Sequence, residues 1–434
     1  MPRILPCLFL ALSTCHASSA AEELSLLTVP LSSESVRVEL RRMQLEHDLE
    51  DRVHFWEYGL ARAMILPTSD GLPLLRQDLD KAHLAYKLSP FPLDKLVGEQ
   101  KLDSSSDQNA FHVDDEPASF CLNQYHSHEE MNAFLKAVGR TVPQLVETIV
   151  VGYSFEGRLI QGLRIGSSSS GPIVVLGAGT HAREWIAPAA ALYLINQLAF
   201  KYQDLDEVRS LLHNVTFYII PSLNPDGYEY SRTSLTGGGS AARLWRKTRS
   251  SYQQSLFTNS RCTGADPNRN WDWHWNTTGV SSDPCGNTWP GVKAFSEPET
   301  IALSEFLRRL HASGRLKMFI SLHSYGEEWL VPYGSNHGLF PDNYKDMYNL
   351  ATVGVNAIKG VHQENYIALN SAELYEASGG SDDWTRGVLN VPFTYTLEVR
   401  PSDGSNGFVL PAREIVPTGE ELFAGLTAVA KALL

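Results

Sequence analysis

Apolar runs of strand length alternate with helical patterns along most of the chain. Four such runs lie at residues 172–179 (PIVVLGAG), 216–222 (TFYIIPS), 318–322 (MFISL) and 393–398 (FTYTLE). A long apolar helical pattern over residues 184–202 follows the first of them. This alternation predicts an α/β domain with a mixed, mostly parallel twisted sheet that helices cover on both faces.

A smaller unit with a different pattern precedes this domain. Residues 36–40 (VRVEL) alternate like a strand, residues 63–67 (AMILP) form a second apolar cluster, and helical patterns lie between and after them. We therefore expect a small α+β domain over residues 21–101. Residues 102–118 are polar, acidic and without apolar periodicity, which is typical of a linker, so the main domain spans residues 119–434.

The end of the chain carries the pattern of one more helix. Thr418 and Glu421 have the spacing of a capping box, in which the two side chains bind the backbone amides of the first helical turn. The spacing predicts a C-terminal helix that begins at Thr418 and continues through Leu434.

Residues 1–20 have the composition of a secretion signal. Arg3 is followed by an apolar run from Ile4 to Leu12, and a segment of small residues ends at Ala20, which predicts cleavage before Ala21. The alternative is a buried N-terminal helix. No later segment reaches the roughly 20 apolar residues that a membrane-spanning helix needs, so we expect a secreted, extracellular protein without a membrane partner.

Composition excludes further classes of protein. The 434 residues are 43% hydrophobic and 20% charged, which is typical of a soluble globular protein rather than a disordered one. The formal net charge of −13 argues against a nucleic-acid partner, because a protein that binds nucleic acid needs a basic face.

Three of the five cysteines lie outside the predicted signal. An oxidising compartment favours one disulfide among them, and we predict Cys262–Cys285 because that pair closes a short loop. Cys121 then stays free. Asn214 and Asn276 begin Asn-x-Thr tripeptides and are candidate glycosylation acceptors.

The pattern His-x-x-Glu places two potential metal ligands one helical turn apart. It occurs four times, as His47/Glu50, His54/Glu57, His126/Glu129 and His181/Glu184. Only His181 directly follows an apolar strand, and ligands of open α/β sheets gather at the carboxyl ends of strands. We interpret the other three pairs as salt-bridged surface, because they lie in charged helical stretches or beside the linker.

Two further strand ends carry side chains that can complete a metal site. His323 follows the strand MFISL, and Glu398 ends the strand FTYTLE, where a carboxylate is costly unless it has a partner. These groups can converge with His181 and Glu184 on one metal centre; structural histidines and a surface carboxylate are the alternative. The sequence contains no His-Glu-x-x-His helix, no Gly-x-Ser-x-Gly elbow and no phosphate-binding P-loop.

Seven sequence blocks, in one order, are similar to a known family. They are Thr180-His-Ala-Arg-Glu-Trp185, Asn224-Pro-Asp-Gly227, Arg243-Leu-Trp-Arg-Lys-Thr-Arg-Ser250, Asp266-Pro-Asn-Arg-Asn270, Leu322-His-Ser-Tyr325, Tyr375-Glu-Ala-Ser-Gly-Gly-Ser-Asp-Asp-Trp384 and Leu397-Glu398. Residues 120–434 thereby resemble the pancreatic carboxypeptidase A/B family of zinc carboxypeptidases. Residues 22–100 resemble the family's N-terminal propeptide more loosely. The resemblance implies a metallocarboxypeptidase, made as a proenzyme, that hydrolyses the C-terminal bond of peptides and proteins.

The resemblance assigns roles at the predicted metal centre. It implies that His181, Glu184 and His323 bind one Zn²⁺ per chain, and that Asp266 accepts a hydrogen bond that orients His181. Glu398 matches the family's general base, which takes a proton from the attacking water.

Further residues match positions that contact the substrate. Arg246 is implied to stabilise the developing oxyanion. Asn268, Arg269 and Tyr375 match the residues that hold the terminal carboxylate, and Arg183 is a further candidate for substrate binding. A planar guanidinium binds a carboxylate through two hydrogen bonds, so an internal peptide bond, which brings no terminal charge, leaves the arginine unsatisfied.

Asp382 falls at the pocket-floor position that sets the preferred terminal residue in this family. A buried carboxylate there favours a cationic side chain and penalises an apolar one, so we expect preference for C-terminal Lys or Arg. The adjacent Asp383 belongs to the shared Ser-x-Asp-Trp pattern and is interpreted as structural. Preference for apolar terminal residues, or a non-catalytic binding protein on the same scaffold, are the alternatives.

The resemblance also implies partners and processing. We expect a monomer that acts on peptide C-termini and that its own propeptide inhibits. Family proenzymes are commonly opened by trypsin-like cleavage, but no Lys or Arg occurs between Leu102 and Leu135. Cleavage after Lys101, and cleavage near Ala118 by a protease of different specificity, both remain open.

Overall fold

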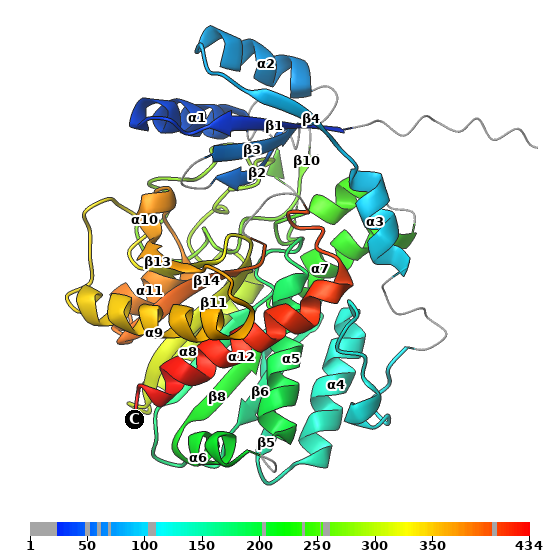
Figure 1. Ribbon diagram of the computed structural model, residues 1–434, viewed down its shortest axis with the longest axis vertical. Coiled ribbons are helices and arrows are strands. Elements are labelled where there is room, and N and C mark those ends of the chain that lie inside the picture. Colours follow the sequence, from blue (N-terminus) through cyan, green and yellow to red (C-terminus); the bar gives the residue numbers. More distant parts are fainter. Residues whose placement is uncertain are drawn as a thin grey trace, which may run out of the picture.

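The computed structural model describes residues 24–434 apart from 48–52, 59–61, 68–70, 103–109, 202–204, 237–238, 252, 255–260 and 402–405. The predicted secretion signal with its cleavage position, Glu50, and residues 103–109 of the predicted linker lie outside the described residues. The described chain forms a small N-terminal unit stacked on one end of a larger unit (Figure 1).

The N-terminal unit is an antiparallel sheet that two helices cover. Its described strands are β1 (Leu24–Pro30), β2 (Val53–Tyr58), β3 (Arg62–Pro67) and β4 (Lys87–Phe91), in the order β2-β3-β1-β4. Helices α1 (Glu34–His47) and α2 (Gly71–Lys81) pack on the sheet, and the shared core includes Leu27, Leu40 and Leu75. The predicted α+β character is confirmed, and residues 63–67 lie in β3.

The strand predicted at residues 36–40 is wrong, because these residues lie inside α1. Leu40 and Met43 are fully buried and Val36 packs against the same core, whereas Val38 is 62% exposed. Positions 36, 40 and 43 follow the period of a helix. Five residues with apolar side chains at every second position are therefore too short a pattern to distinguish a strand from one face of a helix.

The larger unit contains a mixed sheet. Among the described residues its order is β13-β12-β14-β11-β7-β8-β6-β5. The strands are β5 (Val146–Tyr153), β6 (Leu159–Ile165), β7 (Ile173–Ala178), β8 (Thr216–Ile220), β11 (Leu316–Ser324), β12 (Glu328–Val331), β13 (Ile367–Asn370) and β14 (Phe393–Val399). The central strands β14, β11, β7 and β8 run parallel, and β5, β6 and β12 join antiparallel. All four strands predicted from apolar runs are central strands.

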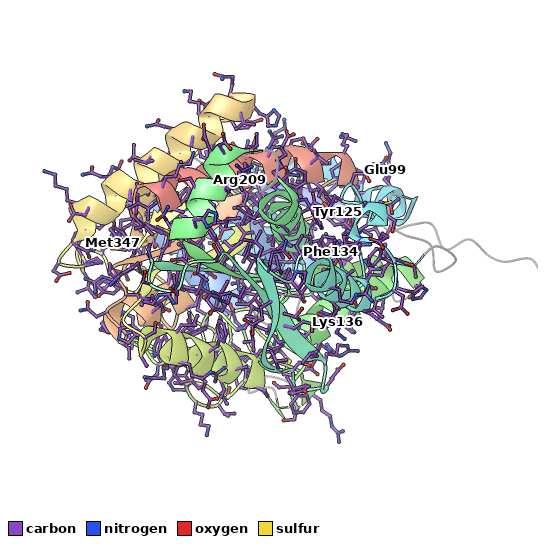
Figure 2. All side chains as sticks on the ribbon, turned by 90° about the horizontal axis from the view of Figure 1, so that it is seen from below. Glu99, Tyr125, Phe134, Lys136, Arg209 and Met347 are labelled. Atoms are coloured by element: carbon purple, nitrogen blue, oxygen red, sulfur yellow. A yellow bond between two sulfur atoms is a disulfide. The ribbon has the colours of Figure 1, made fainter. Side chains whose placement is uncertain are left out.

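Helices cover both faces of this sheet, as predicted. On one face lie α4 (His128–Thr141), α5 (Ile186–Phe200), α6 (Asp206–Asn214), α9 (Tyr344–His362) and α12 (Ile415–Lys431). On the other lie α8 (Pro298–His311) and α11 (Ser381–Gly387). Strand β7 is buried on both sides because Val174 packs toward the first group and Val175 toward the second. In α4, Phe134 is fully buried and Lys136 is exposed; both residues are labelled in Figure 2.

The C-terminal helix begins earlier than predicted. Helix α12 starts at Ile415, after the short 3-10 helix η5 (Ala412–Glu414), and ends at Lys431. Thr418 is fully buried inside the first turns, and its hydroxyl donates to the carbonyl oxygen of Glu414 at 2.6 Å. A threonine hydroxyl that bonds back to the preceding turn mimics the sequence of a capping box without capping the helix.

Helix α3 (Leu93–Leu102) connects the two units. It packs against the short 3-10 helices η3 (Thr233–Thr236) and η4 (Ser240–Leu244) of the larger unit. Residues 233–236 and 240–244 of the larger unit therefore form the contact surface for α3. The remaining described elements are η2 (Pro117–Ser119), α7 (Pro225–Arg232), β9 (Gln253–Gln254), β10 (Arg261–Cys262) and α10 (Ser371–Leu374). In the part of the chain that the structure describes, every helix is too short or too polar to cross a lipid bilayer.

Candidate active site

Three side chains, two from the turn after β7 and one from the neighbouring strand β11, meet at the carboxyl edge of the sheet. His181 follows β7, Glu184 precedes α5, and His323 lies in β11, which pairs with β7. The Nδ1 atom of His181 lies 2.7 Å from Oε1 of Glu184, and Nδ1 of His323 lies 3.0 Å from Oε2 of the same carboxylate. All three side chains are almost completely buried. The turn after β7 depends on Gly179, which has a φ of +69° and lies against the Pro221 carbonyl oxygen.

This donor set fits zinc. The Nδ1 atoms of His181 and His323 face each other at 3.1 Å, so both cannot carry a proton and at least one presents a lone pair. Burial lowers the pKa of His181, which favours the neutral imidazole that binds metals. Burial opposes ionisation of Glu184, but His181 and His323 overcome it and hold the pKa of Glu184 below its usual value. Among the described residues the group consists of these three ligands, and a catalytic zinc keeps its fourth position for water or substrate.

A second layer of hydrogen bonds holds the two histidines. The fully buried Asp266 lies 3.1 Å from Nε2 of His181 and accepts two hydrogen bonds from Arg246, at 3.0 and 2.9 Å. Burial would raise the pKa of Asp266, yet Arg246 and His181 hold it well below its usual value. The hydroxyl of Ser321 lies 2.8 Å from Nε2 of His323. Both rings are therefore fixed by their far nitrogen while the near nitrogen faces the shared centre.

Glu398 lies beside this group on β14. It is the register partner of His323 in the parallel pair β11/β14. Its Oε2 atom is buried and has no hydrogen-bond partner among the residues that the structure describes. Burial and the neighbouring Glu184 raise the pKa of Glu398 well above its usual value. A carboxyl group in such surroundings is suited to accept a proton and release it again.

The side chains predicted to contact the substrate are held by contacts with other parts of the chain. Arg269 is 4% exposed, and its side chain donates to the carbonyl oxygens of Gly279 and Asn268 at 3.0 and 2.8 Å. The ring centre of Tyr375 lies 6.0 Å from its guanidinium. Arg183 is stacked 4.0 Å from the ring centre of Phe408. Burial, with a contribution from Arg246, lowers the pKa of Arg183 to about 10.

The two adjacent aspartates at the start of α11 have different surroundings. Asp383 accepts hydrogen bonds from the backbone amides of Gly334 and Ser335, at 2.9 and 3.0 Å. Its predicted structural role agrees with these bonds. Asp382 is 5% exposed, and burial raises its pKa. Thr396, which lies two residues before Glu398 on the same face of β14, opposes this rise in the pKa of Asp382.

Other predicted features lie away from this centre. Cys262 and Cys285 form the predicted disulfide, which precludes a metal site at these residues, and Cys121 is free and exposed. Asn214 and Asn276 are both exposed.

We predicted that the pair His126/Glu129 forms salt-bridged surface, and this prediction is wrong. His126 is 4% exposed, stacks on Phe120 at 3.9 Å and lies 3.5 Å from Glu130 instead of Glu129. The side chains of His54 and Glu57, like that of His47, lie outside the described residues.

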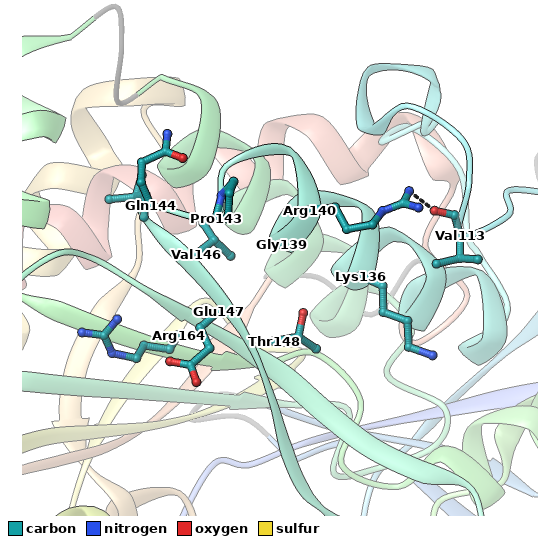
Figure 3. Close-up of a pocket in the computed structure, with 11 residues that line it drawn as sticks. Val113, Lys136, Gly139, Arg140, Pro143, Gln144, Val146, Glu147, Thr148 and Arg164 are labelled. Atoms are coloured by element: carbon teal, nitrogen blue, oxygen red, sulfur yellow. Dashed lines mark hydrogen bonds between the residues drawn. The ribbon is translucent and has the colours of Figure 1, made fainter.

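A surface hollow lies elsewhere on the larger unit. It has a volume of about 730 Å³, and residues of α4, β5 and β6 line it, among them Lys136, Glu147 and Arg164 (Figure 3). Arg140 donates to the carbonyl oxygen of Val113 at its rim. None of its lining residues belongs to the His181 centre, so the hollow has no part in the site.

Sequence reasoning missed two buried polar contacts, one inside the site and one between α3 and the larger unit. Ser321 precedes His323 by two positions in β11 and supports its ring. Gln100 of α3 accepts a hydrogen bond from the buried Arg243 at 2.8 Å and donates to the carbonyl oxygen of Leu410. Alternation along β11 places Ser321 and His323 on one face and is a signal that could have identified Ser321. No sequence pattern could have identified Gln100, because its partners Arg243 and Leu410 are far away in the sequence.

Comparisons with known proteins extend over most of the chain. The zinc carboxypeptidase family, Peptidase_M14, matches residues 131–425. Carboxypeptidase B of Astacus astacus is 40% identical over 308 residues, which cover 70% of this chain and 96% of that protein. Zinc carboxypeptidase A 1 of Drosophila melanogaster is 36% identical over 379 residues, which cover 85% of this chain and 82% of that protein.

Solved structures are similar over both units. Carboxypeptidase A from Helicoverpa armigera has a TM-score of 0.80 and 27% identity, and covers 94% of this chain and 98% of that one. Thrombin-activatable fibrinolysis inhibitor has a TM-score of 0.78 and 26% identity, and covers 95% of this chain and 98% of that one. The likeness therefore includes the N-terminal unit, which the family match does not reach.

Proposed function

Since the chain belongs to the zinc carboxypeptidase family and is a zinc-dependent carboxypeptidase, we propose that His181, Glu184 and His323 bind its zinc ion. The observation that carries this proposal is the convergence of three buried ligand atoms, all within 4.8 Å of one another. When bound, the zinc supplies a Lewis acid that polarises the scissile carbonyl group. Asp266 and Ser321 orient the two imidazole rings.

Glu398 is the proposed general base. It takes a proton from the water that attacks the scissile carbonyl and passes this proton to the leaving amine. Its position opposite His323 and its raised pKa support this role, because a buried carboxyl group whose pKa lies well above the usual value holds a proton more readily after accepting it. Arg246, which Asp266 holds through two hydrogen bonds, stabilises the negative charge that develops on the carbonyl oxygen.

Asn268, Arg269 and Tyr375 are proposed to bind the substrate's terminal carboxylate, with Arg183 as a further contact. The buried guanidinium of Arg269 is already oriented by two carbonyl oxygens, so little side-chain entropy is lost when a carboxylate binds. An internal peptide bond offers no charge to this group. The requirement for a free C-terminus follows from that difference.

Asp382 is proposed to give preference for C-terminal Lys or Arg. Burial raises the pKa of Asp382, which means that its ionised form is disfavoured in the empty pocket. An incoming ammonium or guanidinium group stabilises that ionised form and is bound more tightly as a result. An apolar terminal side chain leaves the carboxyl group without a cationic partner. The competing proposal is preference for apolar terminal residues.

The N-terminal unit is proposed to be an inhibitory propeptide within residues 21–101, followed by an activation segment at 102–118. Its α3 inserts Gln100 between Arg243 and Leu410, and Arg243 also donates to the carbonyl oxygen of Arg183. Cleavage after Lys101, in the last turn of α3, and cleavage near Ala118, in the short 3-10 helix η2, are the two proposed activation sites.

The enzyme is further proposed to be a secreted monomer, released by removal of residues 1–20. The disulfide and the exposed acceptors Asn214 and Asn276 agree with an oxidising, glycosylating route of export. Mass spectrometry of the protein from a eukaryotic culture medium tests the mature N-terminus and both acceptors. A protein retained in the cells with residues 1–20 intact contradicts secretion.

Release of terminal residues by the trypsin-processed protein tests the catalytic function and its preference. The substrates are peptides that differ only in a terminal Arg, Lys, Leu or Glu. We expect release of Arg and Lys to exceed that of Leu by about 100-fold, because a buried unpaired charge opposes the apolar residue. A chelator should abolish release and added zinc should restore it.

Matched variants separate the competing functions. Glu398→Gln should keep the zinc and lose release, while Glu373→Gln, at an exposed position of α10, should leave both unchanged. Asp382→Leu should reverse the preference between Arg and Leu. Faster release of Leu than of Arg by the unaltered protein contradicts the basic preference alone. A zinc-loaded protein that releases no residue contradicts catalysis and supports the non-catalytic alternative.

A further inference from the structure

A small interior cavity lies directly behind the proposed active site. It has a volume of about 20 Å³ and is lined by Glu299 and Thr300 of α8, Ser381 of α11, and Thr180, Asn224 and Pro267 from loops. These residues are buried. Thr180 precedes His181, Pro267 follows Asp266 and Ser381 precedes Asp382. The cavity therefore touches the segments that hold the metal ligands, the outer carboxylate and the specificity position.

Two polar atoms of the cavity wall have no hydrogen-bond partner within the described part of the chain. They are Oε2 of Glu299 and the hydroxyl oxygen of Ser381, from side chains that are 3% and 2% exposed. The other carboxyl oxygen of Glu299 accepts a hydrogen bond from the backbone amide of Phe155 at 3.0 Å. Buried polar atoms are normally satisfied, so two of them on one cavity indicate a bound polar molecule between them.

The volume of the cavity and the charge of its wall indicate that the bound molecule is water. Its volume suffices for about one water, which needs roughly 10–15 Å³. Burial, together with the nearby Glu297 and Asp226, raises the pKa of Glu299 to about 8, so the carboxyl group is mainly neutral at pH 7. A neutral carboxyl group and a hydroxyl group supply both donors and acceptors for water.

We propose that one buried water bridges the carboxyl group of Glu299 and the hydroxyl group of Ser381, and that Glu299 thereby acts as a positioning residue for substrate recognition. The amide of Ser381 donates to Oδ1 of Asn268 at 3.0 Å, and Asp382 is the next residue. The bridge fixes the start of α11 relative to α8. This inference rests on the proposed roles of Asn268 and Asp382 in binding the terminal residue.

A crystal structure of the processed protein and the kinetics of two variants at Glu299 test the bridge. We expect density for one water within hydrogen-bond distance of both Oε2 of Glu299 and Oγ of Ser381. Glu299→Leu should raise the KM for a peptide ending in Arg about tenfold and change kcat less than about twofold, because it disturbs binding and not the reacting groups. Glu299→Gln keeps a donor and an acceptor and should preserve KM.

Controls make the result specific to the bridge. Glu305→Leu alters an exposed residue of the same helix and should leave KM unchanged. If Glu299→Leu does not fold, Ser381→Ala removes the other end of the bridge and should raise KM in the same way. A dry cavity overturns the proposal, as does a Glu299→Leu variant whose melting temperature and kcat fall while KM stays constant. Failure of the proposed function is distinct, since the unaltered protein would then release no terminal residue.

Discussion

Asp266 is a carboxylate with no solvent exposure, and its charge is balanced by Arg246 while it also binds His181. A buried charge is tolerated only when its partners replace the water that it has lost. Here the partners are a proposed zinc ligand and the residue proposed to stabilise the oxyanion. One carboxylate thus couples the metal centre to the substrate side of the site, and changing it should affect both.

Asp266→Asn should weaken zinc binding. The amide cannot balance the charge of Arg246 and holds the imidazole of His181 less firmly, and loss of such outer contacts typically reduces metal affinity about 10–100-fold. Competition with a chromogenic chelator measures the affinity. Asp272→Asn changes an exposed aspartate near it in sequence and should bind zinc normally. Unchanged affinity in Asp266→Asn would show that His181 needs no outer support.

Glu299 makes stability depend on pH in a predictable direction. Its pKa is about 8 in the folded protein against the usual 4.5, so the folded state binds this proton more tightly than the unfolded chain. The contribution to stability is complete below pH 4.5 and is lost as the pH rises towards 8. The side chain of Glu299→Gln does not ionise, so this variant keeps its stability as the pH rises. Its free energy of unfolding relative to the unaltered protein should therefore increase by roughly 2–4 kcal/mol between pH 5 and pH 8. Urea unfolding at both pH values measures this; an equal difference at both would contradict the shifted pKa.

Among single residues, the sequence predicted those proposed to bind the metal and missed the buried polar residues that support them. His181 and His323 stand out because each follows or ends an apolar strand. Glu299 and Ser381 do not stand out, because a polar residue in a helical pattern is normally exposed and only the packing of α8 against the site loops buries these two.

The elements themselves were predictable where their apolar patterns were long. The central strands and α5 carry runs with few competing interpretations, whereas α1 contains a short run that fits two periods. Helix α12 begins before Thr418 because the buried Ile415 belongs to the same apolar stripe as Leu422 and Leu426. Burial of that stripe outweighs the local capping signal. Helix α3 was predictable as a helix, but its docking on η3 and η4 depends on residues far away in the chain.

Gln100→Ala should weaken the hold of α3 on the larger unit. The change removes the partner of the buried Arg243 and a donor to Leu410. Because hydrogen bonds to buried charged groups contribute about 1.5–3 kcal/mol, the N-terminal unit should dissociate at least about tenfold more readily after cleavage of the linker. Recovery of peptidase activity after cleavage measures the release. Glu99→Ala, on the outer side of the same helix (Figure 2), is the control. Equal recovery in both variants would exclude Gln100 as an anchor.

At the scale of the whole molecule, the site exists because the sheet order brings separate strand ends together. Strand β11 pairs with β7 on one side and β14 on the other, which places His323 between the His181 turn and Glu398. The sequence predicted strands with polar ends and a mostly parallel sheet. It could not give the strand order or the register, because central strands that are apolar on both faces carry no pattern that distinguishes one neighbour from another.

The disulfide affects both the stability of the whole molecule and the position of the site residues that it encloses. Cys262 and Cys285 are 23 residues apart, and the segment they enclose carries Asp266, Asn268 and Arg269. A cross-link that closes a loop of this length reduces the entropy of the unfolded chain and should contribute roughly 3 kcal/mol to stability.

Replacing both cysteines by serine should therefore lower the free energy of unfolding by about this amount, roughly 3 kcal/mol. It should also raise KM more than it lowers kcat, because the enclosed segment supplies the proposed carboxylate clamp while the zinc ligands and Glu398 lie outside it. Chemical unfolding and steady-state kinetics measure the two effects, and Cys121→Ser, at an exposed free thiol, should produce neither. A loss of stability with unchanged KM would mean that packing around Trp271 and Trp384 alone holds the segment in place.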